Sequence, residues 1–233
     1  MVHNENSRVK IPALIHLEKI GYKYLSLKNI EWNKETNIID EIFKNKVQEL
    51  NPEKSPEEIE VYLKQVVASL SNEDLGKAFF DHLINQNGIR ILDLHNFDNN
   101  QLNCVTEFEY EKDHDSFRPD ITILINGLPL AFIEVKKPNN SEGIMAERKR
   151  IDTRLQNKKF RKIINLTQIM VFSNNMEYDD TDPNALQGAF YSTTATDKAK
   201  FNFMREEIYD YKDKALYPHD SDIDLILRDT NLI

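Results

Sequence analysis

The sequence is poor in cysteine and in long apolar runs, and each shortage excludes a class of protein. Cys104 is the only cysteine among the 233 residues, so an internal disulfide is impossible and a reducing compartment such as the cytoplasm is expected. The N-terminus has no secretory apolar segment, and no apolar run is long enough to cross a membrane. No Gly-x-x-x-x-Gly-Lys loop is present, so this chain is not expected to carry an ATP-driven motor itself.

Basic residues are in the minority. The 30 lysines and arginines are outnumbered by 39 aspartates and glutamates, which gives a net charge of −9 at pH 7. That balance argues against a free-standing DNA-binding protein held by bulk positive charge, but it allows a nuclease whose DNA is delivered by other domains or subunits. The six histidines are scattered, and His114, between two aspartates, has no second histidine at ligand spacing, so zinc is not expected.

Two short apolar segments around a turn dominate the middle of the chain. Residues 121–125 (ITILI) and 130–135 (LAFIEV) are rich in β-branched and apolar residues and predict two β-strands. The Asn126-Gly127 pair between them is typical of a tight hairpin turn. Three charged residues interrupt the apolar pattern: Asp120, Glu134 and Lys136.

The spacing of these charges indicates which of them share a face. Glu134 and Lys136 are two residues apart, so on a strand they point to the same side, while Ile133 and Val135 point to the core on the other side. An unpaired charge in a buried sheet is costly, so we expect the charged groups to serve a site or to pair with one another.

The turn decides whether Asp120 joins them. A strict two-residue turn would place Asp120 opposite Ile133, on the face away from Glu134. A three-residue loop, or a turn with Gly127 in a bulge, changes the parity and would place Asp120 opposite Phe132 and diagonally beside Glu134. We therefore predict a bulge or a three-residue loop at this turn.

Two converging carboxylates form a hard oxygen site suited to Mg²⁺, which accepts phosphate oxygens as further ligands. Asp120 and Glu134 are the predicted ligands, and the backbone carbonyl of Val135 is a further candidate. Lys136 cannot be a ligand because an ammonium only donates; it can orient or deprotonate a water, or stabilise charge on a reacting phosphate. The alternative is a buried ion-pair cluster of Asp120, Glu134 and Lys136 with no ligand.

These residues carry a family resemblance. Pro119-Asp120, thirteen intervening residues, and then Glu134-Val135-Lys136 are similar to the PD-(D/E)xK nuclease motif. The phrase ITILINGLPL followed by IEVKKP is more specific, and it resembles the N-terminal endonuclease domain of the restriction (R) subunit of type I restriction enzymes. The resemblance covers most of the chain and is strongest from about residue 118 to residue 175.

The resemblance implies an α/β fold of the restriction-endonuclease-like kind, with a mixed, mainly antiparallel sheet flanked by helices. It implies Mg²⁺-dependent cleavage of double-stranded DNA, for which Mn²⁺ can substitute, by Asp120, Glu134 and Lys136, without sequence readout by this domain. It also implies a longer polypeptide with ATP-binding, helicase-like domains after residue 233, and a complex with modification (methyltransferase) and specificity subunits.

The resemblance also points to supporting residues. Related nucleases carry a Gln-x-x-x-Tyr element on the helix after the second acid, and here the nearest match is Gln156, with Phe160 in the place of the tyrosine. Related domains carry a glutamate on the first helix, for which this chain offers Glu18. Gln156 is therefore the candidate for a residue that supports the site.

A basic segment follows the hairpin in this otherwise acidic chain. Eight lysines and arginines fall within residues 148–162. Arg150, Arg154 and Lys158 are four residues apart and would share a helix face, well placed to hold DNA phosphates. The alternative is a solvated basic face. The candidate DNA-binding residues are Arg148, Arg150, Arg154, Lys158 and Lys159.

The rest of the chain surrounds this centre. Apolar spacing and caps predict helices at residues 8–20, 37–50, 55–70, 71–87 and 142–158, and strands at 22–27, 89–94, 102–110, 166–172 and 187–194. We expect one nuclease domain over residues 1–233, with a helical block at 36–87 and a catalytic sheet core at 88–195. The helical block is either a layer over the sheet or a docking surface for a partner.

Two other functions remain open. The first is a catalytically silent module that keeps the nuclease fold for docking within the restriction complex. The second is a stand-alone repair or junction nuclease, which the scarcity of basic surface disfavours. Binding of Mg²⁺ would separate the enzyme from the silent module, and a dimer with two facing sites would favour the stand-alone nuclease.

Overall fold

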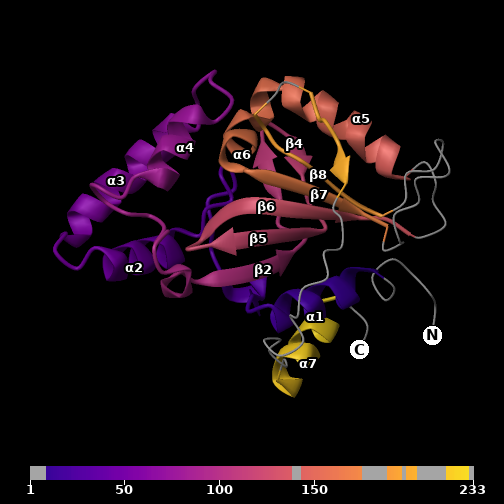
Figure 1. Cartoon of the computed structure of the whole chain (residues 1–233), viewed down its shortest axis with the longest axis horizontal. Helices are drawn as coiled ribbons and strands as arrows, with labels where there is room; N and C mark the ends of the chain where they lie inside the picture. Colours follow the sequence, from indigo (N-terminus) through magenta and orange to yellow (C-terminus); the bar gives the residue numbers. More distant parts are fainter. Residues whose placement is uncertain (1–8, 138–142, 175–187, 196–197, 204–218, 231–233) are drawn as a thin grey trace.

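The computed structural model describes residues 9–137, 143–174, 188–195, 198–203 and 219–230. In this part of the chain a seven-stranded sheet is flanked by helices (Figure 1). The helices are α1 (Ile11–Lys19), α2 (Asp40–Leu50), α3 (Pro56–Ser69), α4 (Lys77–Ile84), α5 (Gly143–Gln156), α6 (Arg161–Leu166) and α7 (Asp220–Asp229), with short 3-10 segments η2 (Leu27–Asn29), η3 (Phe97–Asn99) and η4 (Lys158–Phe160). No helix among the described residues has the length and apolarity needed to span a membrane.

The sheet is mixed and mainly antiparallel, as predicted. Its order is β1 (Lys23–Tyr24), β2 (Leu102–Thr106), β5 (Ile121–Ile125), β6 (Leu128–Val135), β7 (Ile169–Ser173), β8 (Ala189–Ser192) and β9 (Asn202–Phe203). The β1–β2 and β6–β7 pairs are parallel and the other pairs are antiparallel. The chain crosses from β6 through α5 to β7, which pairs in parallel with β6. A separate ribbon pairs β3 (Tyr110–Lys112) with β4 (Asp115–Phe117).

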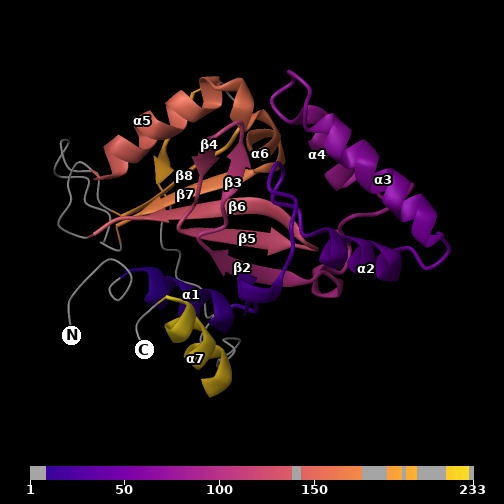
Figure 2. The ribbon, with the colours of Figure 1, turned by 180° about the vertical axis from the view of Figure 1, so that it is seen from behind.

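The two faces of the sheet are covered by different helices. On one side, α1 and α7 lie next to each other (Figures 1 and 2). They pack on side chains that point to this face of the sheet, such as those of Ile121 in β5 and Ile133 in β6. On the other side, α5 and α6 pack on Phe132 and Phe172. This alternation of neighbouring residues between two cores follows from the period of two along a strand.

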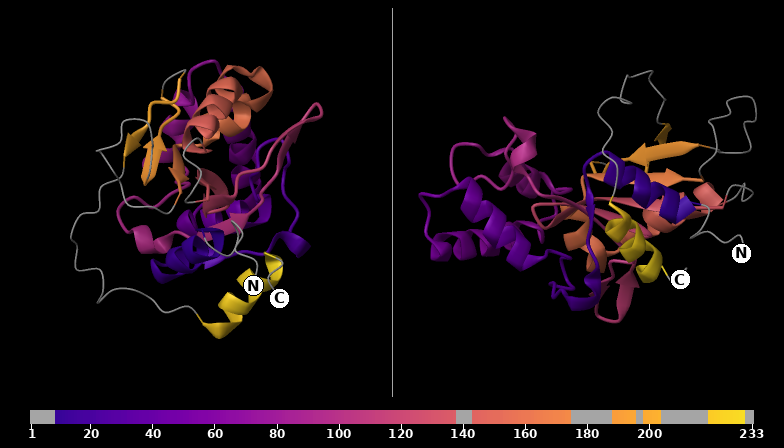
Figure 3. Two further views of the ribbon diagram at one scale, coloured as in Figure 1. Left: turned by 90° about the vertical axis from the view of Figure 1, so that its right-hand side faces the viewer. Right: turned by 90° about the horizontal axis from the view of Figure 1, so that it is seen from below.

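The helical block of α2, α3 and α4 stands at one end of the sheet rather than over a face (Figures 1 and 3). Its core includes Phe43 and Phe79, and it closes on Leu128 and Leu130 at the start of β6 and on Leu166 of α6. Helix α3 begins as predicted, with a capping box in which Ser55 and Glu58 bond each other's backbone N–H groups. The expected layer over the sheet is therefore an end cap.

The β5–β6 turn is a two-residue turn, which corrects the expectation of a longer loop or a bulge at the turn. Ile125 pairs with Leu128, and Asn126 and Gly127 have φ values of 51° and 79°. Such a pair of positive φ angles matches the twist of the strands. A Cβ on Gly127 would lie 2.8 Å from the carbonyl oxygen of Ile39, so the helical block closes tightly on this turn.

A bulge nevertheless changes the parity, within β6 itself. Ile123 pairs with Ala131 but Leu124 pairs with Pro129, so Leu130 between them has no partner in β5. The extra residue brings Ile121 opposite Ile133. Asp120 therefore comes directly opposite Glu134. We had expected it opposite Phe132 and diagonally beside Glu134, so the predicted partner was wrong by two residues.

Two other elements differ from the prediction for local reasons. Residues 89–94 form bends instead of a strand, because side-chain amides satisfy their backbone: Asn51 accepts from the N–H of Arg90, and Asn126 donates to the carbonyl of Ile91. Helix α4 begins at Lys77 and not near residue 71, because Leu75 and Gly76 adopt left-handed conformations that a helix cannot contain.

Strand β2 is likewise shorter than predicted. It ends at Thr106 because Glu107 has a φ of 54°, and the chain then enters the separate β3–β4 ribbon. Cys104 in this strand has a free thiol and is fully buried as a small core residue.

Candidate active site

The candidate catalytic residues lie at the end of the β5–β6 hairpin away from its turn. Asp120 immediately precedes β5, Glu134 lies near the end of β6, and Lys136 follows β6. Because β6 has eight residues, this end of the hairpin lies about 25 Å along the strand from the turn. The structure brings the three sequence-predicted residues together.

Asp120 is held across the hairpin by the backbone of β6. The N–H of Val135 donates to Oδ2 of Asp120 at 2.9 Å. Burial comes first, and the negative charges of Asp120 and Glu147 and a hydrogen bond that protonated Glu134 donates to Asp120 add to it, so the pKa of Glu134 is raised to about 8. Two carboxyl groups thus converge in a buried place where one of them resists ionisation.

Lys136 lies between two glutamates. Its Nζ is 3.9 Å from Oε2 of Glu134 and 3.3 Å from Oε1 of Glu147. Glu147, on α5, is 2% exposed and also pairs with Arg150. Glu147 was not among the residues predicted from the sequence, although its helical spacing with Ile144 and Ile151 marks the buried face of α5.

Lys10 is a second residue that the sequence analysis missed. It immediately precedes α1 and is 4% exposed, with Nζ 3.1 Å from Oδ1 of Asp120 and an ion pair to Glu107. Burial lowers the pKa of Lys10, but the hydrogen bonds and charges of Glu107 and Asp120 outweigh this, so the pKa is raised and the side chain is an ammonium. Its spacing with Leu14 and Leu17 on the buried face of α1 was the available signal.

The predicted supporting residues lie elsewhere. Glu18, at the end of α1 away from Lys10, is buried and accepts the N–H of Tyr24. Gln156 is the last residue of α5, about 13 Å along the helix from Glu147, and lines a groove near α6. The structure does not bring either residue to the carboxyl cluster.

The candidate DNA-binding residues are divided along α5 and beyond it. Arg150 pairs with Glu147 beside Lys136, and Arg148 lies over the ring of Phe201 at 5.6 Å. We had expected Lys158 to continue the helix face of Arg150 and Arg154. Helix α5 ends at Gln156, however, and Lys158 lies in η4, so it does not continue that face. Two lysines pair with acids of other elements: Lys158 lies 3.5 Å from Glu73, and Lys159 lies 2.9 Å from Asp115.

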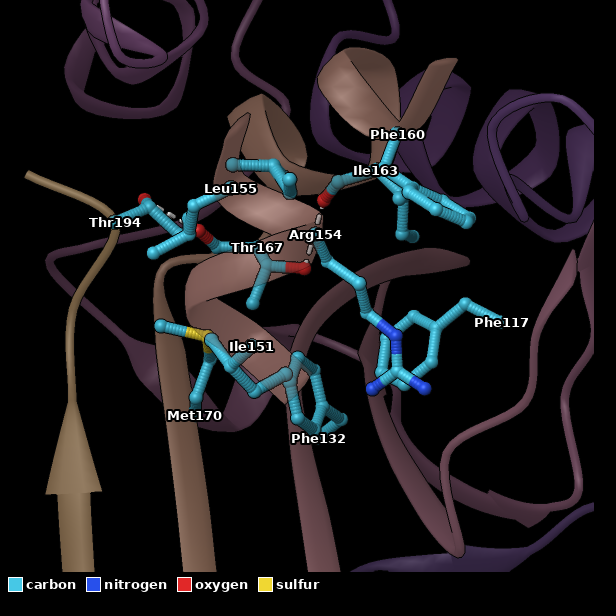
Figure 4. Close-up of a pocket in the computed structure, with 11 residues that line it drawn as sticks. Phe117, Phe132, Ile151, Arg154, Leu155, Phe160, Ile163, Thr167, Met170 and Thr194 are labelled. Carbon is cyan, nitrogen blue, oxygen red and sulfur yellow. Dashed lines mark hydrogen bonds between the residues drawn. The ribbon is translucent and has the colours of Figure 1, made fainter. Parts of the chain in front are cut away.

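Arg154 is the basic residue most closely built into the fold. Its guanidinium lies over the ring of Phe117 at 4.0 Å, at the edge of a small apolar pocket between the sheet and the helices α5 and α6 (Figure 4). Burial lowers the pKa of Arg154, and the charges of Glu134 and Glu147 oppose that shift. Its Nη1 is buried and has no hydrogen-bond partner among the described residues.

The residues present fit a divalent cation. Asp120 and Glu134 are hard oxygen donors whose mutual repulsion a cation between them would relieve. In a strand the N–H and C=O of one residue face the same neighbour, so the carbonyl of Val135 is directed to the side of Asp120. Among the described residues, no group of three or more histidine, cysteine, aspartate or glutamate side chains is arranged to hold a metal ion. Waters would therefore complete the coordination shell of the cation, as is common for Mg²⁺.

Comparisons with known proteins identify the family of this chain. The family described as "Type I restriction enzyme R protein N terminus" matches residues 3–185. A Methanocaldococcus jannaschii protein described as a type I restriction enzyme endonuclease subunit, MjaIXP, is 26% identical over 213 residues, which cover 81% of this chain and 20% of the relative. A second protein of that organism, described as the MjaVIIIP endonuclease subunit, is 30% identical over 99 residues, 42% of this chain and 9% of the relative. This chain thus spans about a fifth of the length of the first relative, and it belongs to the family of type I restriction enzyme R protein N-terminal regions.

Proposed function

We propose that this chain is the Mg²⁺-dependent endonuclease domain of a type I restriction enzyme R subunit, which hydrolyses phosphodiester bonds of double-stranded DNA without reading base sequence. The observation that carries the proposal is the meeting of Asp120, Glu134 and Lys136 in one buried cluster at the end of the hairpin. A buried cluster with a strongly raised carboxyl pKa is typical of catalytic sites.

Each residue has a role in this chemistry. The two carboxylates of Asp120 and Glu134, with the carbonyl of Val135, hold the cation, which when bound polarises the phosphate and lowers the pKa of water. Lys136 orients the attacking water and stabilises the negative charge that develops on the phosphate oxygens. Glu147 fixes the ammonium of Lys136 in this place through the 3.3 Å ion pair.

DNA is held by the basic residues of α5 next to the cluster. Arg148, Arg150 and Arg154 contact backbone phosphates through their guanidinium groups. Lys158 and Lys159 add positive charge at a greater distance from the cluster. The net charge of −9 requires other parts of the enzyme to deliver the DNA, which suits a longer polypeptide with ATP-dependent domains and partner modification and specificity subunits.

One observation favours a second candidate, a silent docking module. The protein itself supplies a positive charge to Asp120, because Nζ of Lys10 lies 3.1 Å from its Oδ1. In such a module, the ion pair would replace the metal and the cluster would serve stability alone.

The test is cleavage of supercoiled plasmid by the full chain, by Lys136→Ala and by Lys137→Ala, with Mg²⁺, with Mn²⁺ and with chelator. Lys137 is the exposed neighbour of Lys136 and serves as the matched control. We expect the wild type and Lys137→Ala to nick or linearise the plasmid only with metal, and Lys136→Ala to be slower by about a hundredfold or more.

Equal cutting by Lys136→Ala would contradict the assignment of the catalytic lysine. Absence of cutting by every protein, together with absence of Mn²⁺ binding that depends on Asp120 and Glu134, would favour the docking module.

A further inference from the structure

Lys10 places a buried positive charge directly on a candidate metal ligand. Its side chain is 4% exposed, and its Nζ lies 3.1 Å from Oδ1 of Asp120. Lysine is almost never buried to this extent unless its charge is paired, so this contact is a built feature of the site. None of the roles assigned above to the catalytic residues uses it.

The position of the ammonium is fixed from the other side. Glu107 pairs with Lys10 and, through its second carboxylate oxygen, accepts from Nε of Arg118 at 2.8 Å. Glu107 holds a left-handed φ of 54°, and its N–H donates to the carbonyl of Asp120 at 3.3 Å. Lys10 therefore lies between two anchored carboxylates instead of extending to solvent.

The two oxygens of Asp120 differ as a result. Oδ2 accepts the N–H of Val135 on the side of Glu134, whereas Oδ1 faces the ammonium of Lys10. In sites with two divalent cations, the ions lie about 3.5–4 Å apart. A second cation held by Oδ1 of Asp120 would meet the ammonium of Lys10, which lies 3.1 Å from that oxygen.

We propose that Lys10 supplies the second positive charge of the site as a fixed side chain, so that the chain takes one divalent cation and not two. This inference rests on the proposed function and specifies its metal requirement. The ammonium repels the single cation that Asp120 and Glu134 share, and it keeps that side of Asp120 positive when the reacting phosphate binds.

Removal of the ammonium should therefore move two measurements in opposite directions. Without the repulsion of Lys10, the cation binds more tightly, by about tenfold or more in dissociation constant. Without the second positive charge at the phosphate, cleavage becomes slower. A residue that only supported the fold would weaken both binding and cleavage.

The experiment is a titration of the full chain with Mn²⁺, followed by electron paramagnetic resonance and calorimetry, for the wild type, Lys10→Met, Lys10→Arg and Lys28→Met. Lys28 pairs with Asp229 on α7 and is a matched control away from the site. We expect one Mn²⁺ per wild-type chain, tighter binding by Lys10→Met, and wild-type behaviour of Lys28→Met and, closely, of Lys10→Arg. Lys10→Gln replaces Lys10→Met if circular dichroism shows that Lys10→Met is unfolded.

The outcomes separate this inference from the proposed function. Two Mn²⁺ ions per wild-type chain, or unchanged affinity in a folded Lys10→Met or Lys10→Gln, would overturn the role of Lys10 and leave the nuclease proposal standing. No Mn²⁺ bound by the wild type would overturn both. One ion, with tighter binding and slower plasmid cleavage in the Lys10 variant, would support the inference.

Discussion

Glu134 is the residue of the site whose ionisation is most strongly disfavoured. Its pKa is raised to about 8 by burial first and by the neighbouring carboxylates second, against an ordinary value of 4.5. Between these two pH values the folded chain binds more protons than the unfolded chain, so without metal the free energy of unfolding falls as pH rises from about 4.5 through 8.

This fall of the free energy of unfolding with rising pH predicts the effect of Glu134→Gln. The variant keeps the shape and loses the charge, so we expect it to be more stable than the wild type at pH 8 by on the order of 2 kcal/mol, with little difference at pH 4.5. Urea unfolding in chelator at several pH values measures this. The exposed Glu41→Gln serves as the control, and equal pH slopes for wild type and Glu134→Gln would contradict the prediction.

Glu147 acts through Lys136 and not on the substrate. We expect Glu147→Ala to slow cleavage by about 10- to 100-fold, because Lys136 loses the partner at 3.3 Å that fixes its ammonium. DNA binding should be unchanged. The effect should be absent in the background of Lys136→Ala, since the two residues work as a unit.

The control for Glu147 is Asp152→Asn on the same helix. Asp152 accepts the N–H of Ala199 at 2.7 Å and has no contact with the cluster among the described residues. Equal and additive losses for Glu147→Ala in both backgrounds would show that Glu147 only supports the fold.

At the scale of elements, the β5–β6 hairpin depends on its turn. Gly127→Ala would require a left-handed alanine and bring a Cβ to 2.8 Å from the backbone oxygen of Ile39 on the helical block. We expect a loss of about 2 kcal/mol or more in the free energy of unfolding, measured with urea.

Gly88→Ala is the matched control for this turn. Gly88 has no positive φ, and an added Cβ would meet only a side-chain nitrogen of Asn85 at 3.2 Å. Its effect should stay within about 0.5 kcal/mol. Similar losses for the two variants would mean that the turn geometry is not the cause.

The elements that the sequence predicted best are those whose signals are local. The capping box at Ser55 fixes the start of α3, and the β-branched and apolar residues 121–125 give β5. Residues 89–94 read as a strand because they are apolar, but the amides of Asn51 and Asn126, distant in sequence, hold their backbone in bends. No local pattern could reveal those partners.

At the scale of the whole molecule, the candidate site combines a local motif with distant contributions. Asp120, Glu134 and Lys136 were predictable because one hairpin presents them together. Lys10 and Glu147 come from the first and fifth helices, and only the packing of α1 and α5 on opposite faces of the sheet brings them to that hairpin. The helical spacing of Lys10 and Glu147 indicated that both side chains are buried. It did not indicate that they contact Asp120 and Lys136.

The unpaired Leu130 has a consequence for how this family varies. With the bulge, Asp120 and Glu134 face each other across thirteen intervening residues; a regular ladder with the same turn would bring them opposite across twelve. A one-residue deletion at the bulge would thus restore regular pairing and preserve the match of the two acids. Such a deletion therefore leaves the two acids paired, and a motif search that fixes the interval at thirteen residues would overlook relatives that lack the bulge.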